Sequence, residues 1–184
     1  MEQTKVQDET GREGLAKYMM LDMSAKQLGD FGEQLVMFLL GRLYKSNVAY
    51  VDYVGADLIA QAPGEEKGHA ISVKSRVFTT DGPQQPFDAS QQEKLRTFAE
   101  TFGLTPRVAF VCIDKIDLRQ DVNIDVYMID LEDFENMANK VKGITATGID
   151  GKTLHFSNAP ANQQYLQHNE LINFHRLTLH GMEK

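Results

Sequence analysis

Lys74 lies in the middle of a half-apolar segment, HAISVKSR at 69–76. A lysine inside such a strand is unfavourable unless its ammonium group has a partner. Asp57 lies 17 residues earlier, directly after Gly55 and Ala56, so a short turn would bring its carboxylate beside the ammonium. The two groups form either a plain ion pair or a site, in which a metal-binding carboxylate lies beside a lysine that stabilises charge on a reacting phosphate.

Glu33 and Gln91 occupy positions on predicted helices from which they could reach the same region. Glu33 falls at the edge of an apolar stripe beside Leu40, and Gln91 lies one turn before the apolar Leu95. Each side chain can lean into a cleft between helix and sheet. The alternative for Glu33 is a solvated helix residue, and for Gln91 and Gln92 it is ordinary polarity at a helix N-terminus.

Alternation within 69–76 predicts which side chains share a face. Ile71 and Val73 are expected to be buried under a helix, whereas Ser72, Lys74 and Arg76 are expected on the opposite face, with Lys74 sharing a cleft with Asp57.

The elements that must position these residues begin with a helix. A capping box at Ser24-Ala25-Lys26-Gln27 opens it, and the apolar periodicity carries it to about Lys45. Three short segments rich in β-branched and aromatic residues then predict an antiparallel meander, with strands at 48–54, 57–62 and 69–76.

A second helix is predicted from a capping box at Ser90-Gln91-Gln92-Glu93 to Gly103. A helical crossover after a meander gives an α/β fold whose mixed sheet is flanked by helices. The remaining elements are expected as a strand at 107–113 buried on both faces, a strand at 123–130, a short helix at 131–140, a strand at 153–156 and a helix at 161–174.

Length and composition describe a single domain. The chain of 184 residues is expected to fold as one unit over 1–184, with a core at about 24–140 and a C-terminal extension at 141–184. Its apolar runs are too short to span a membrane, and its first residues lack the apolar core of a signal peptide, which predicts a soluble cytoplasmic protein. The lone Cys112 is expected to be a buried small hydrophobe.

The formal net charge of −7 counts against a protein that holds nucleic acid by bulk electrostatics alone. The acidity is concentrated at 113–140, which has eight acidic and three basic residues. This region is expected to be a solvated face; an alternative is a surface that docks a basic partner.

Four motifs together resemble the PD-(D/E)xK phosphodiesterase superfamily, which has the restriction-endonuclease-like fold. The resemblance extends from about Ser24 to Asp130, and GEQLV and the VKSR ending are similar to the Holliday-junction-resolvase-like and Mrr-like branches. The motifs are GEQLV at 32–36, GADLIA at 55–60, ISVKSR at 71–76 and the glutamine-bearing helix SQQEKLRTF at 90–98.

The resemblance implies hydrolysis of DNA phosphodiester bonds with bound Mg²⁺ or Mn²⁺. It implies DNA as the partner and is compatible with a homodimer. By matching position, Lys74, Asp57 and Glu33 are the expected catalytic residues. The expected metal ligands are Asp57, Glu33 and the carbonyl of Val73, and the expected DNA contacts are Arg76, Gln91, Gln92 and Lys94.

One position departs from the family pattern. Ser72 stands where the (D/E)xK triplet has its second acid, and a neutral hydroxyl is a weaker ligand than a carboxylate for a hard cation. The predicted function is therefore a metal-dependent DNA endonuclease or a degenerate descendant of one. The alternative is a non-catalytic module of the same fold that binds nucleic acid or a protein.

Overall fold

A six-stranded sheet in the order β1-β2-β3-β4-β5-β6 forms the centre of the protein. The computed structural model describes residues 24–77, 87–113, 121–138 and 172–180. The elements are α2 (Ala25–Leu43), β1 (Asn47–Tyr53), β2 (Ala56–Gln61), β3 (His69–Val77), α3 (Ala89–Phe102), β4 (Thr105–Ile113), β5 (Val122–Asp130), α4 (Leu131–Ala138) and β6 (Ile172–Leu179). None of the described helices is long and apolar enough to cross a membrane.

The sheet is mixed, as the element order predicts. β1, β2 and β3 form an antiparallel meander, α3 then crosses over, and β4 pairs parallel to β3. β5 and β6 return antiparallel. The predicted α/β class and the predicted crossover are both confirmed.

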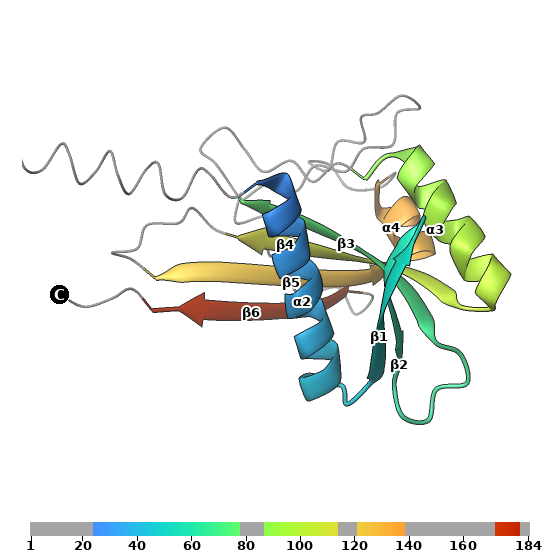
Figure 1. Cartoon of the computed structure of the whole chain (residues 1–184), viewed down its shortest axis with the longest axis horizontal. Coiled ribbons are helices and arrows are strands. Elements are labelled where there is room, and N and C mark those ends of the chain that lie inside the picture. Colours follow the sequence, from blue (N-terminus) through green and yellow to red (C-terminus); the bar gives the residue numbers. More distant parts are fainter. Residues whose placement is uncertain (1–23, 78–86, 114–120, 139–171, 181–184) are drawn as a thin grey trace, which may run out of the picture.

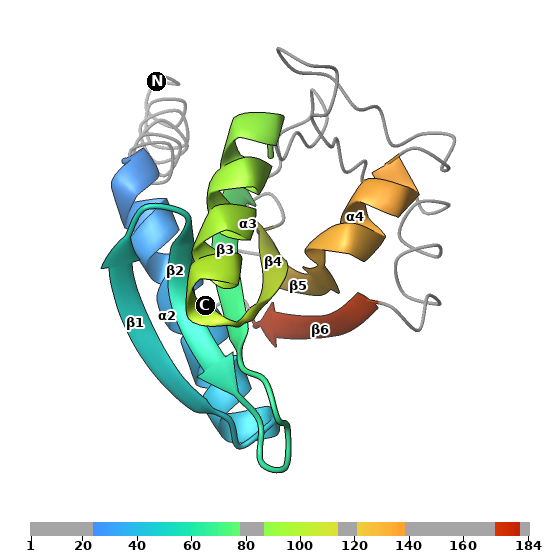
Figure 2. The same cartoon turned by 90° about the vertical axis from the view of Figure 1, so that its right-hand side faces the viewer.

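Helices cover both faces of this sheet, and each face has its own core. On one face, Val36 and Leu39 of α2 pack on Ile71 and Val73, as predicted for these two strand residues. Figure 1 shows α2 running across this face. On the other face, α3 and α4 cover the sheet with residues such as Leu95, and Figure 2 shows these two helices apart from α2.

The N-terminus of α3 differs from its prediction. The cap is Asp88, whose carboxylate accepts a hydrogen bond from the backbone N–H of Gln91 at 2.9 Å, while the backbone N–H of Asp88 donates to the Gln91 side chain at 3.3 Å. Ser90 lies inside the helix, so the predicted capping box at Ser90 is wrong. Gly103 ends the helix in the left-handed conformation, as predicted.

Other boundaries differ as well; the strand predicted at 107–113, for example, already begins at Thr105. α2 ends at Leu43, two residues before the predicted Lys45, which itself has a positive φ of 51° that no helix accommodates. Residues 172–174, predicted as the end of a helix, begin strand β6, because they pair with β5. The rest of that predicted helix and the predicted strand at 153–156 lie outside the described residues.

The acidic region at 113–140 is not simply a solvated face. Asp125 is buried at 6% exposure and receives two hydrogen bonds from Arg176. The expectation of a solvated face is wrong at this position, because a buried carboxylate is retained only with a charged partner. Two further acids also pair with arginine side chains, Asp130 with Arg107 and Glu135 with Arg96. Cys112 is buried, as predicted.

Candidate functional site

Asp57 lies where β2 and β3 stop pairing. The β2–β3 ladder ends at Leu58 and Ile71, and one residue further the Asp57 carboxylate replaces the backbone as acceptor. Its Oδ2 accepts hydrogen bonds from the backbone N–H of Val73 at 2.6 Å and from the Ser72 hydroxyl at 3.2 Å. We call this point the β2–β3 fork. Since the N–H and C=O of one strand residue point the same way, the Val73 carbonyl also faces the fork.

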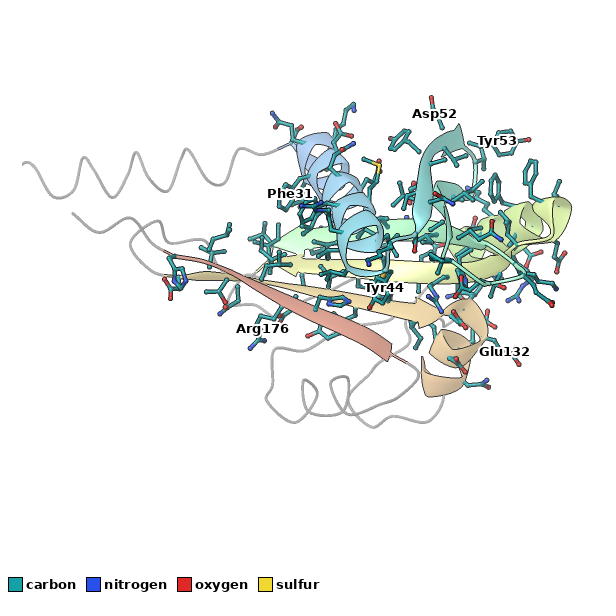
Figure 3. All side chains as sticks on the ribbon, turned by 90° about the horizontal axis from the view of Figure 1, so that it is seen from below. Phe31, Tyr44, Asp52, Tyr53, Glu132 and Arg176 are labelled. Carbon is teal, nitrogen blue, oxygen red and sulfur yellow. The ribbon has the colours of Figure 1, made fainter. Side chains whose placement is uncertain are left out.

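Gly55, two residues before Asp57, lies at the tip of the β1–β2 hairpin and packs closely on α3. Its φ is +112°, and a Cβ added there would lie 2.3 Å from the carbonyl oxygen of Lys94 in α3. The hairpin therefore packs backbone against backbone on α3, which is possible only without a side chain. Figure 3 shows Asp52 and Tyr53 at this tip.

Glu33 lies on α2, and the charge of Asp57 at the fork affects its pKa. Burial is the main reason that the pKa of its carboxyl is raised, and the nearby charge of Asp57 raises it further. A hydrogen bond from Tyr50 and the positive charge of Lys74 act in the opposite direction. The carboxyl of Glu33 therefore responds to the charges of Asp57 and Lys74, the two residues with which it was grouped.

One carboxylate oxygen of Glu33 has no partner within the described part of the chain. Oε2 is buried and accepts no hydrogen bond from the described residues. A buried acceptor without a donor is unfavourable, and a positively charged or hydrogen-bond-donating ligand would remove this cost.

Tyr50 belongs to the site and has no counterpart among the predicted residues. Its hydroxyl donates a hydrogen bond to the Glu33 carboxylate, and this bond and the negative charge of Glu33 raise the pKa of Tyr50 to about 12. The tyrosine is half-exposed on β1, the edge strand of the meander. No spacing or motif in the sequence identifies it, because its contact depends on how α2 crosses the sheet.

Lys74 is partly buried and lies on the same strand face as Ser72, two residues before it. Its Nζ lies 5.7 Å from the centre of the Phe87 ring, which is completely buried just before α3. Phe87 is a second residue that sequence reasoning missed, since nothing in its local sequence indicates a contact with a strand residue.

The four residues predicted to contact DNA fall into two groups. Arg76 and Lys94 are exposed and stay available to a ligand on the surface. Gln91 caps α3, and Gln92 is buried at 3% exposure, where its amide donates to the carbonyl of Phe87 at 2.7 Å. The two glutamines therefore serve the N-terminus of α3, and Gln92 is buried away from any ligand on the surface.

The donor set at the fork fits a hard divalent cation. It consists of oxygen atoms from the carboxylates of Asp57 and Glu33 and the carbonyl of Val73, the ligand type that Mg²⁺ prefers. The unpartnered Oε2 of Glu33 is the feature of this structure that matches such an ion. Among the described residues, no group of three or more histidine, cysteine, aspartate or glutamate side chains could hold a metal ion.

Glu33→Gln is expected to raise the melting temperature at neutral pH. A raised carboxyl pKa means that folding is penalised when the group is ionised, and this penalty disappears as the pH falls through the raised pKa towards the ordinary value of about 4.3. Thermal unfolding between pH 4 and 8 measures this, and the difference between Glu33→Gln and the parent should shrink on acidification. The control is Glu93→Gln, at an exposed position of α3. An equal, pH-dependent rise in its melting temperature would contradict a penalty specific to Glu33.

Comparison with known proteins finds similarity at the level of structure. No protein-family model matches the chain, and no curated protein matches its sequence. The Holliday junction resolvase Hjc of Archaeoglobus fulgidus, an archaeal hyperthermophile, superimposes with a TM-score of 0.44 at 16% sequence identity, covering 71% of this chain and 89% of that chain. With similarity at this level, function has to be argued from the residues of the site itself.

Proposed function

We propose that the protein is a divalent-metal-dependent DNA endonuclease of the PD-(D/E)xK type, with its active site at the β2–β3 fork. The observation that carries the proposal is the buried oxygen of Glu33, which has no partner among the described residues and belongs to a carboxyl that responds to the charges of Asp57 and Lys74. A carboxylate held in this way, with a second carboxylate and an ammonium group nearby, matches the needs of metal-assisted phosphodiester hydrolysis.

Each group then has one role. Asp57, Glu33 and the Val73 carbonyl would hold Mg²⁺ or Mn²⁺, which supplies a Lewis acid for the phosphate and lowers the pKa of a bound water. Tyr50 fixes the orientation of the Glu33 carboxylate through its hydroxyl. The Lys74 ammonium neutralises charge that develops on the phosphate oxygens.

Nicking of supercoiled plasmid tests the proposal. Relaxed circles should appear with Mg²⁺ or Mn²⁺ and not in EDTA, and Asp57→Ala should abolish the reaction without unfolding the protein. Activity that persists in EDTA, or that is unchanged in Asp57→Ala, would contradict a metal site at the fork.

A non-catalytic module of the same fold is the second candidate, and Ser72 is the observation that favours it. The Ser72 hydroxyl donates to Asp57, so this position supplies no second acid. A DNA gel shift separates the two candidates: binding of DNA without any metal-dependent cleavage would favour the module. Because the chain is acidic, such binding should rely on a few cations such as Arg76 and Lys94 and depend only weakly on salt.

Ser72→Asp is expected to raise Mg²⁺ affinity about tenfold or more, since a third negative ligand strengthens a hard-cation site. Without metal the variant should be less stable than the parent, because its carboxylate faces that of Asp57. Calorimetry and thermal shift with added Mg²⁺ measure both effects.

Ser75→Asp serves as the matched control, because Ser75 lies under α2, against Gly32, on the other face of β3. It should destabilise the protein with no rescue by Mg²⁺. The gain in Ser72→Asp should also vanish when Asp57→Ala is added, since both residues would act on one ion. The same gain without Asp57 would place the ion elsewhere.

A further inference from the structure

We propose that Phe87 is a positioning residue that holds the Lys74 ammonium over its ring, where the ammonium acts in the proposed site. The inference rests on the proposed function and adds to it a residue outside the motif. The Nζ-to-centroid distance of 5.7 Å is within the range of a cation–π contact.

The Phe87 ring is fixed by its surroundings. It is completely buried and meets the rings of Phe110 and Phe134 edge to face, with centroids 6.3 Å and 5.7 Å away. Such edge-to-face pairs are favourable arrangements of aromatic rings. The ring under Lys74 is therefore held by β4 and α4 at once.

The backbone of Phe87 is fixed as well. The buried amide of Gln92 donates to its carbonyl at 2.7 Å, and Gln92 belongs to the first part of α3. Asp88, the next residue, caps the same helix. Phe87 is therefore fixed by the N-terminus of α3 and by two rings, and its own ring is a rigid surface for the flexible Lys74 side chain.

This surface suits a lysine that must act on a phosphate. A lysine side chain has several rotatable bonds, and holding it in one place costs entropy that an attractive neighbour offsets. An aromatic face attracts the ammonium and leaves its positive charge available to developing negative charge.

Phe87→Met provides the test, because methionine fills much of the space and has no ring. The first measurement is the NMR resonance of the Lys74 ε-methylene group in lysine-labelled protein without metal or DNA. The Phe87 ring current should shift this resonance upfield from those of the other lysines in the parent, and Phe87→Met should return it to their range. Phe98→Met, which removes a ring of the same core that packs on Tyr53 and Phe102, should leave it upfield.

The second measurement is the nicking rate. Phe87→Met should lower kcat about 3- to 30-fold with little change in KM, since the lysine acts on charge in the transition state. Phe98→Met, which also removes a buried ring of this core, should keep kcat. Gln92→Met should lower kcat in the same direction as Phe87→Met, because it releases the Phe87 carbonyl.

The outcomes separate the two proposals. A Lys74 resonance that is not shifted upfield, or that stays in place in Phe87→Met, overturns the positioning role whatever the enzyme does. Equal losses of kcat in Phe87→Met and Phe98→Met also overturn it, since the effect would then follow stability. If the resonance moves as expected and the parent cuts no DNA, the contact stands and the endonuclease proposal fails.

Discussion

Replacing Lys74 with alanine is expected to lower kcat for Mg²⁺-dependent plasmid nicking about 100- to 1000-fold, the usual effect of removing one group that stabilises transition-state charge. KM should change little, because the ammonium group is proposed to act on charge that develops during the reaction. The fold should survive, since Lys74 is only partly buried at the edge of the fork. Initial rates of nicking, with circular dichroism of both proteins, measure the effect.

Lys67→Ala is the matched control for this prediction. Lys67 is exposed in the β2–β3 connection, at the end of these strands away from the fork, and its loss removes the same charge from the protein. Its nicking rate should stay within about twofold of the parent, the range expected for a surface substitution. Equal losses in both variants would show that net charge, and not the site, controls the rate. An unaffected Lys74→Ala would remove Lys74 from the mechanism.

Replacing Gly55 with alanine is expected to lower the free energy of unfolding by about 2–5 kcal/mol, which combines backbone strain with a steric clash. The φ of +112° is unfavourable for any residue with a Cβ, and the new atom would lie 2.3 Å from a backbone carbonyl oxygen of α3. Neither the hairpin tip nor α3 can move easily, because the clash is with backbone atoms. Urea denaturation followed by circular dichroism gives the difference.

Gly64→Ala separates the two contributions. Gly64 has a φ of +87°, but an added Cβ there would meet nothing within 4 Å. This variant should show the backbone strain alone, about 1–2 kcal/mol. If Gly55→Ala costs no more than Gly64→Ala, the hairpin tip is not pressed against α3. If it costs more, metal affinity should also fall, since Asp57 lies two residues from the tip.

The strands of the meander and the crossover helix were predictable, because each has a clear local period and Gly or Pro at its ends. The N-cap of α3 was not, since Asp88 with Gln91 and Ser90 with Glu93 both have capping-box spacing. Docking of the buried Phe87 beside Asp88 distinguishes the two, and this is a tertiary effect. β6 was missed for a similar reason, as pairing with β5 stabilises a strand in a segment whose own pattern is weak.

The candidate site also contains residues that could be predicted from the sequence and residues that could not. Asp57, Lys74 and Glu33 could be named from sequence, since a charged residue inside an apolar pattern is conspicuous. Tyr50 and Phe87 could not, because aromatic residues in strands and before helices are ordinary core formers. Their contacts with Glu33 and Lys74 arise only when α2 and α3 lie on opposite faces of the sheet.

The single parallel pairing in the sheet has a kinetic consequence. β1, β2 and β3 are joined by short turns and can pair early during folding, whereas β4 reaches β3 only after the chain has closed a loop that contains all of α3. Asp57 and Val73 belong to the fast part, and the Phe87 ring belongs to the slow part. In refolding experiments the contact between Asp57 and Val73 should therefore form first. The contact between Lys74 and the Phe87 ring should form last. Under the proposed function, a newly made chain would therefore position the Asp57 and Val73 oxygens for the cation before it positions Lys74 for DNA cleavage.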